Sequence, residues 1–149
     1  YHESAGLGGQ AKALDKSLGG FITDALKTMK FEGKKNKFYA MLRPGGSEYT
    51  LVIVQGVGKD APAEKDMADL GGALQAYLEG MKLEEAVVTI ESPFKGVSSE
   101  TLAANMAFGA RLRSYRFLKY YKKKQEEQKT NLKKITYLVD KEKEAKKQY

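Results

Sequence analysis

Apolar side chains recur at helical and strand spacings along most of the chain, and their order predicts helices alternating with strands. Steps of three and four residues predict an amphipathic helix over residues 11–29, interrupted or kinked at Gly19 and Gly20. The same spacing predicts a helix over residues 62–81, which begins with Pro62, and another from Ser98 to about residue 121. Three amphipathic segments are therefore expected to bury one face each.

Four shorter segments have the composition of strands and lie between or after these helices. They are residues 37–42, 48–55, 85–90 and 134–139. The segment EYTLVIVQ at 48–55 contains an unbroken β-branched run, which predicts a strand buried on both faces, and residues 37–42 are expected to form a hairpin with it or to lie beside it. The alternation predicts a three-layer α/β domain with a mixed, mainly parallel sheet flanked by helices.

Length and composition agree with one folded domain over residues 1–149. The 149 residues are 42% hydrophobic, which is enough for a single core. The chain has no Cys and one His, His2, so it has no thiolate zinc site, no Ser-His-Asp triad and no two-His metal site. It contains no apolar run of the roughly 20 residues that a bilayer requires, and we expect a cytoplasmic, noncatalytic domain.

The positive charge is confined to one end of the chain. The formal net charge is +7, residues 1–114 hold 14 basic and 14 acidic side chains, and residues 115–149 hold 12 basic and 5 acidic ones. Cations mixed with aromatic residues from Gly109 to Lys124 are typical of a nucleic-acid surface. The candidate contacts are Arg111, Arg113, Lys119, Lys122, Lys123 and Lys124.

A second interpretation of this segment is a packed helix with a solvated outer face. On a helix, Phe108, Leu112, Tyr115 and Leu118 fall on one stripe, which predicts that they face the sheet while Arg111, Arg113 and Lys119 point outward. Charge runs are usually solvated surfaces, so this interpretation is favoured and nucleic-acid binding stays as the alternative.

The loop Gly56-Val57-Gly58-Lys59 follows a predicted strand and precedes a predicted helix, where phosphate-binding loops occur. Ile53 stands where a P-loop has its first Gly, and Asp60 stands in place of the hydroxyl residue that holds magnesium. A tight turn is therefore favoured over a phosphate site.

Four features together resemble the N-terminal domain of the leucyl (cytosol) aminopeptidases. The segment GARLRSYRF at 109–117, followed by Tyr120 and the lysines from Lys122, is similar to the long-helix signature of that domain. Phe31-x-Gly33-Lys34, the loop at 56–59 and the pair Gly71-Gly72 agree in order and spacing. The resemblance extends over residues 14–149.

The resemblance implies a macro-like α/β domain placed before a separate catalytic domain, with residues 139–149 starting the connection. It also implies enzymes that assemble as hexamers and remove N-terminal residues from peptides with two zinc or manganese ions. The family's catalytic motifs, such as NTDAEGR, are absent here, so no catalytic or metal-binding role passes to any residue of this chain. The extra strand that usually precedes Gly6 in the family is also absent, which leaves the sheet without that edge strand.

The leading hypothesis is thus a noncatalytic domain of a leucyl aminopeptidase that serves subunit assembly and access to active sites elsewhere. Its expected partners are its own C-terminal catalytic domain, further copies in a homo-hexamer, and peptide substrates, without a membrane. Nucleic-acid binding is the alternative, and ADP-ribose binding by the loop at 56–59 is a weaker one.

Overall fold

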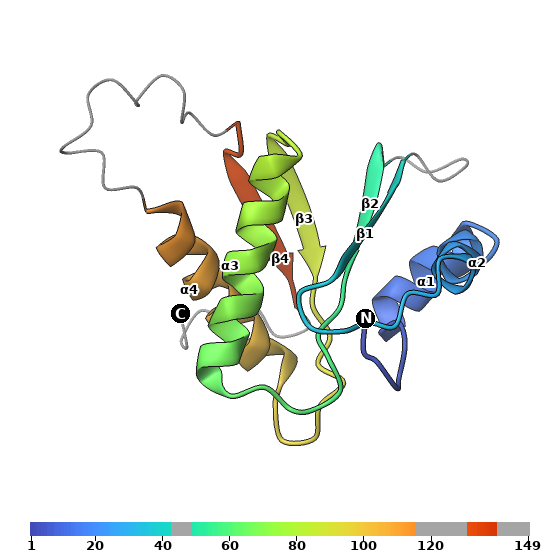
Figure 1. The fold of residues 1–149 in the computed structure, drawn as a ribbon, viewed down its shortest axis with the longest axis horizontal. Helices are drawn as coiled ribbons and strands as arrows, with labels where there is room; N and C mark the ends of the chain where they lie inside the picture. Colours follow the sequence, from blue (N-terminus) through green and yellow to red (C-terminus); the bar gives the residue numbers. More distant parts are fainter. Residues whose placement is uncertain (43–48, 116–130, 140–149) are drawn as a thin grey trace. The chain divides into compact units, whose positions relative to one another are not determined.

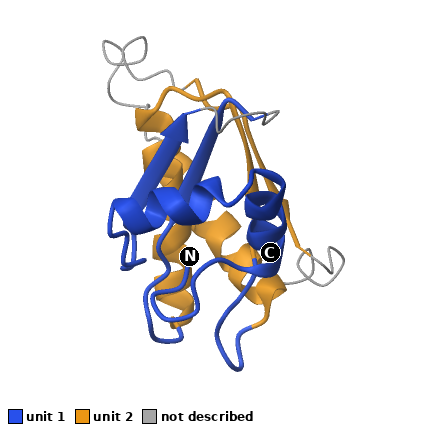
Figure 2. Ribbon diagram, turned by 90° about the vertical axis from the view of Figure 1, so that its right-hand side faces the viewer, with its two compact units in different colours: residues 1–61, 91–97 blue, residues 62–90, 98–149 orange. Residues whose placement is uncertain are grey.

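The structure is a computed structural model that describes residues 1–42, 49–115 and 131–139 (Figure 1). The chain divides into two compact units, coloured separately in Figure 2. Unit 1 comprises Tyr1–Ala61 and Glu91–Val97, and unit 2 comprises Pro62–Ile90 and Ser98–Tyr149. The chain therefore leaves unit 1, enters unit 2, and returns to unit 1 for seven residues before it completes unit 2.

Unit 1 contains two short helices and a hairpin-like strand pair. They are α1 (Gly9–Ser17), α2 (Phe21–Thr28), β1 (Phe38–Leu42) and β2 (Leu51–Gln55). The strands pair antiparallel, with Phe38 opposite Gln55 and Leu42 opposite Leu51. This confirms the predicted neighbouring strands.

The predicted interruption at the glycine pair is also confirmed, and Asp15 explains its geometry. Gly19 and Gly20 have φ angles of 66° and 85°, which glycine adopts readily. The Asp15 carboxylate accepts hydrogen bonds from the backbone N–H of Ile22 at 2.8 Å and of Thr23 at 3.1 Å, and from the Thr23 hydroxyl. Asp15 thus supplies partners for the first amides of α2, as an N-cap does, from the preceding helix.

The core of unit 1 lies between these helices and one face of the strand pair. Its buried members are Ile22, Leu26, Met41 and Val54. Only Val54 of β2 is buried, whereas the other four residues of that strand are half-buried. The prediction of a strand buried on both faces is therefore wrong, because the apolar run packs mainly through alternate residues.

The first residues of the chain run beside the end of β2. The Tyr1 amine donates to the carbonyl of Gln55 at 2.8 Å, the N–H of Val57 donates to the carbonyl of Tyr1, and the N–H of Glu3 donates to the carbonyl of Gly58. These backbone hydrogen bonds tie residues 1–3 to the end of β2 and to the loop that follows it.

Unit 2 contains two long helices and a parallel strand pair. They are α3 (Glu64–Gly80), β3 (Glu85–Thr89), α4 (Ser99–Ser114) and β4 (Lys134–Leu138). Glu85 lies opposite Lys134, and Thr89 opposite Leu138. Each element matches a predicted segment, although α3 begins two residues after Pro62 and α4 ends at Ser114.

The two long helices approach closely because each contributes a glycine to the contact. A Cβ built on Gly71 of α3 would lie 1.8 Å from the carbonyl oxygen of Met106, and one on Gly109 of α4 would lie 1.8 Å from that of Ala68. Real Cβ atoms never come so close, so both positions require glycine. The buried apolar side chains of these helices are Met67, Leu70, Leu74, Leu78, Leu102, Ala103, Ala104, Met106 and Ala110.

The mixed α/β class is confirmed. Among the described residues the strands form two two-stranded sheets, one antiparallel and one parallel, so the pairing is mixed and not mainly parallel. A single sheet between two helix layers stays a prediction.

Candidate functional site

The loop at 56–59 is a tight turn whose amides are already engaged. The N–H groups of Gly56, Val57 and Gly58 donate to the carbonyls of Lys37, Tyr1 and Gly33, at 2.8, 2.9 and 3.0 Å. A Cβ on Gly56 would lie 2.2 Å from the carbonyl oxygen of Lys34. The glycines therefore allow two loops to approach, and the loop offers no row of amides to a phosphate.

His2 belongs to the same corner of unit 1 and has a structural role. Its Nδ1 accepts hydrogen bonds from the backbone N–H of Ser4 and of Ala5, so Nε2 carries the proton and donates to the carbonyl of Lys59 at 3.0 Å. The ring also meets Phe94 edge-on, at 5.2 Å between centroids. Both ring nitrogens are thus used to hold backbone in place.

The candidate nucleic-acid contacts predicted from the sequence begin in the last turn of α4. Arg111 and Arg113 lie in its last turn and are exposed. Lys119, Lys122, Lys123 and Lys124 lie outside the described residues, as does Leu118. The structure therefore describes two of the six predicted contacts, which lie in the same turn of α4.

The predicted inward stripe on α4 is wrong. Phe108, Leu112 and Tyr115 are 47%, 58% and 74% exposed. Met106, Gly109 and Ala110 face α3 instead, and the larger side chains lie on the opposite side of the helix. The backbone also leaves the helix at Tyr115, whose φ and ψ of −69° and 112° are extended, and residues 116–121 of the predicted helix lie outside the described residues.

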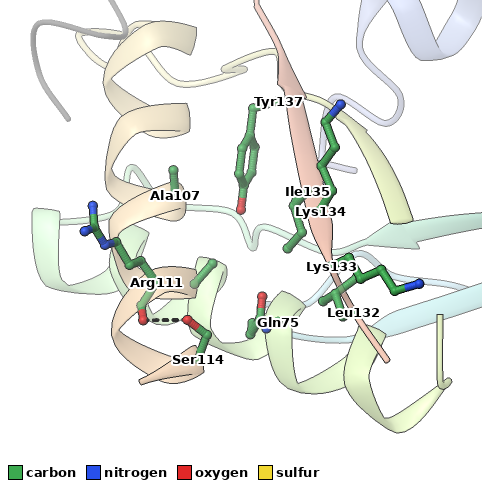
Figure 3. Close-up of a pocket in the computed structure, with 10 residues that line it drawn as sticks. Gln75, Ala107, Arg111, Ser114, Leu132, Lys133, Lys134, Ile135 and Tyr137 are labelled. Carbon is green, nitrogen blue, oxygen red and sulfur yellow. Dashed lines mark hydrogen bonds between the residues drawn. The ribbon is translucent and has the colours of Figure 1, made fainter. Parts of the chain in front are cut away.

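Unit 2 contains a cavity of about 380 Å³ between α3, α4 and β4, which no pattern in the sequence predicted (Figure 3). Its walls are formed by Gln75, Ala107, Ala110, Arg111, Ser114, Leu132, Lys133, Lys134, Ile135 and Tyr137. Figure 3 shows the ring of Tyr137 standing between β4 and α4, with its hydroxyl turned into the space. The alternating pattern of β4 was the only local signal for its share of the lining, since the other walls come from helices distant in sequence.

The charged groups at this cavity are directed away from it. In Figure 3 the Arg111 guanidinium and the amino groups of Lys133 and Lys134 point outward. Lys133 Nζ donates to Glu84 at 2.9 Å, and this hydrogen bond is the main cause that raises the pKa of Lys133. The Ser114 hydroxyl donates to the carbonyl of Arg111, and the Gln75 amide donates to Glu79. The interior thus has no set of groups for acid-base or nucleophilic catalysis.

The described residues contain neither a metal-ligand cluster nor a membrane-spanning helix. Within residues 1–42, 49–115 and 131–139, no group of three His, Asp or Glu side chains could hold a metal ion. The metal pair that the resemblance implies therefore has no ligand set in this part of the chain. Over the same ranges, no helix is both long enough and apolar enough to cross a membrane.

Comparison with known sequences points to one family. Residues 1–124 match the N-terminal domain of the cytosol aminopeptidase family. A probable cytosol aminopeptidase of Caulobacter vibrioides is 33% identical over 80% of this chain, and one of a Bradyrhizobium species is 36% identical over 78% of it. The aligned regions cover only 23% and 24% of those two relatives, so this chain corresponds to about a quarter of each.

Comparison with solved structures gives the same fold. A mutant of tomato leucine aminopeptidase matches 91% of this chain and 27% of its own chain, with a TM-score of 0.67 and 23% identity. The bottromycin maturation enzyme BotP, in complex with Mn, matches 99% of this chain and 27% of its own, with a TM-score of 0.66 and 13% identity. At these identities the likeness concerns the fold.

Proposed function

The chain belongs to the cytosol aminopeptidase family as its N-terminal domain, and we propose that it works as the noncatalytic part of a metal-dependent leucyl aminopeptidase. In this proposal the complete protein removes N-terminal residues from peptides in the cytoplasm. The domain described here contributes to subunit assembly and to access to the active sites, which lie in a separate C-terminal part.

One observation carries the proposal: the match to the family's N-terminal domain covers residues 1–124 of the chain. The relatives with this domain are named aminopeptidases, and the matched region is about a quarter of their length. The described residues offer no metal-ligand cluster. A polypeptide with a noncatalytic N-terminal domain and a separate catalytic part accounts for both facts.

The resemblance extends the proposal to partners and cofactors. We expect the complete protein to bind two zinc or manganese ions in its C-terminal part and to assemble as a homo-hexamer. BotP was solved with Mn, which favours manganese for the first experiments. In the N-terminal domain we expect the macro-like arrangement, with one sheet between two helix layers.

Turnover of Leu-p-nitroanilide tests the proposal. The complete polypeptide, loaded with manganese, is expected to release p-nitroaniline, and the 149-residue chain under the same conditions is expected to release none. The reference preparation is the complete polypeptide after chelation, which should lose its activity. Metal-dependent turnover by the 149-residue chain, or none by the complete polypeptide, would contradict the proposal.

Nucleic-acid binding remains a second candidate because the structure exposes aromatic rings beside cations. Phe108 and Tyr115 lie on the same two turns as Arg111 and Arg113, and all four are exposed. Exposed rings can stack on bases while arginines contact phosphates. The tight turn at 56–59, in contrast, gives ADP-ribose binding no support.

A gel-shift titration separates this candidate from the first. Binding through phosphate contacts releases counterions, so affinity should fall steeply as salt rises. Arg111→Ala with Arg113→Ala should weaken binding and flatten that salt dependence, whereas Lys65→Ala, an exposed lysine on α3, should change neither. Absence of any shift at low salt removes the candidate.

A further inference from the structure

The cavity of unit 2 has the size of a small-molecule site and apolar walls on several sides. Its volume of about 380 Å³ lies in the range of about 300–1,000 Å³ that ligand pockets occupy. The ring of Tyr137 stands between β4 and α4 and forms one wall (Figure 3). Further apolar surface comes from α4 and from the segment that contains β4, at Ala107, Ala110, Leu132 and Ile135. An apolar body such as one aromatic ring therefore fits the space.

Two polar side chains of the lining direct their donors away from this space. Gln75 is 6% exposed and directs its amide nitrogen to Glu79 at 2.9 Å, which leaves its carbonyl oxygen on the side of the cavity, as Figure 3 shows. The Ser114 hydroxyl donates to the carbonyl of Arg111 at 2.8 Å, so its oxygen can only accept a further hydrogen bond. Gln75 and Ser114 therefore offer acceptors to a ligand.

The charges of the lining disfavour an ionised group inside the cavity. Its described residues include three cations, Arg111, Lys133 and Lys134, and no Asp or Glu. An ammonium group would therefore leave water without a counter-charge and would meet side chains of its own sign. A carboxylate has no donor for the oxygens of Gln75 and Ser114, and the cationic groups that could pair with it point outward in Figure 3. An uncharged donor satisfies both conditions.

A primary amide is such a donor, because its NH₂ group has two N–H bonds and no net charge. Two N–H groups match the two acceptors in number, whereas an alcohol has a single O–H. We propose that the cavity binds a small uncharged molecule that carries a primary amide on an apolar body, with the amide directed to Gln75 and Ser114. The site belongs to unit 2 alone and is independent of the proposed peptidase activity.

Three probes of similar shape test the requirement for an uncharged donor. Benzamide, benzoate and benzylamine share one ring, and at neutral pH the group attached to it is neutral, anionic and cationic respectively. Saturation-transfer NMR on the 149-residue chain should detect benzamide at millimolar concentration, and benzamide should shift the backbone amide signals of Ala110 and Ile135. Benzoate and benzylamine should bind several-fold more weakly. Absence of benzamide binding, shifts confined to unit 1, or equal affinity for the three probes would overturn the proposal.

Ser17 provides a matched control for Ser114. Both hydroxyls are exposed and donate to the carbonyl three residues earlier, Ser17 to Leu14 at the end of α1 and Ser114 within the last turn of α4. Ser114→Ala should weaken benzamide binding about three- to tenfold, because one acceptor is lost. Ser17→Ala should leave the affinity unchanged. Equal affinities of the two variants would overturn the placement of the amide.

Gln75→Met removes the buried acceptor at a similar side-chain length. It should weaken benzamide binding about tenfold and remove the preference for benzamide over benzoate and benzylamine. A folded variant that binds benzamide as tightly as the unsubstituted chain would overturn the proposal. If a lowered melting temperature shows that Gln75→Met does not fold, Ser114→Ala decides, because that position is exposed.

Discussion

Units 1 and 2 both bring backbone segments unusually close, but they hold them together by different means. In unit 2, α3 and α4 of 17 and 16 residues meet through Gly71 and Gly109, where the contact depends on the absence of a side chain. In unit 1, helices of nine and eight residues are held by polar groups from elsewhere in the chain, among them Asp15 and Glu91. The helix pair of unit 2 should thus respond most to changes of volume, and the helix pair of unit 1 to changes of charge.

The largest expected loss of stability comes from adding side-chain volume between the helices of unit 2. Gly71→Ala places a methyl group against the carbonyl of Met106 and should destabilise the chain by about 3 kcal/mol or more, since neither helix backbone can yield cheaply. Gly72→Ala is the control, because its nearest atom would be the Gly109 carbonyl oxygen at 3.6 Å, and helix propensity should make it neutral or stabilising by up to about 1 kcal/mol. Chemical denaturation measures the free energy of unfolding of both variants. Similar losses of stability in the two would contradict the dependence of the helix contact on glycine.

The next effect is a pH dependence located in unit 1. Burial lowers the pKa of the Tyr1 amine from 8.0 to about 6. Between these values the unfolded chain holds the proton more tightly, so the free energy of unfolding should rise with pH from 6 to 8, by up to about 2–3 kcal/mol. Below pH 6 the free energy of unfolding is lowered by this full amount, and above pH 8 it is not lowered.

Acetylation of the Tyr1 amine provides the matched sample for that measurement. It removes the titrating group while an N–H remains to donate to the carbonyl of Gln55. Hydrogen exchange of the β1 and β2 amides should lose its pH dependence, after correction for intrinsic exchange, and that of α3 and α4 should not change. A rise in stability with pH that survives acetylation would exclude the amine as its source.

A smaller loss is expected at the junction of α1 and α2. Asp15→Ala removes the acceptor for the backbone N–H groups of Ile22 and Thr23 and should cost about 2 kcal/mol, because buried donors lose their partner. Asp24→Ala, at an exposed position in the first turn of α2, should cost less than about 0.5 kcal/mol. Thermal unfolding compares the two; equal melting temperatures would show that Asp15 does not cap α2.

The smallest effect concerns the segment Glu91–Val97, which joins unit 1 from between β3 and α4. The Glu91 carboxylate accepts from the N–H groups of Gly9 and Gln10, at the start of α1. Glu91→Gln keeps the shape and removes the charge, and should cost about 1 kcal/mol. Glu64→Gln, in the first turn of α3 where no side chain caps the helix, is the control and should cost less. Added salt should reduce the difference between the variants.

Much of the fold follows from local sequence patterns. The helices, the four strands, the break at Gly19 and Gly20, and the cap of α4 were all predictable, and Ser98 accepts from the N–H of Thr101 as its position suggested. These features depend on neighbours in sequence, through side-chain period, turn chemistry and capping. Arg111 and Arg113 are exposed, as the helical spacing predicted, and their role as nucleic-acid contacts stays a prediction.

The prediction of an inward stripe on α4 was wrong because small residues decide the contact between α3 and α4. Phe108, Leu112 and Tyr115 looked like the packing face of α4 because they are large, but Gly109 and Ala110 allow α3 to approach the other side. The cavity at Tyr137 and the engaged amides of the loop at 56–59 also arise from segments far apart in sequence.

The sequence by itself determined the family of this protein, the order of its helices and strands, and the absence of Cys and of any second His on which common catalytic sites depend. Those properties depend on local sequence or on composition, and not on tertiary contacts. The tertiary structure decided which side of α4 is buried, which amides remain for a ligand, and where an apolar surface is exposed. Each of these depends on how closely two backbones pack, and that distance is set jointly by residues that no local pattern connects.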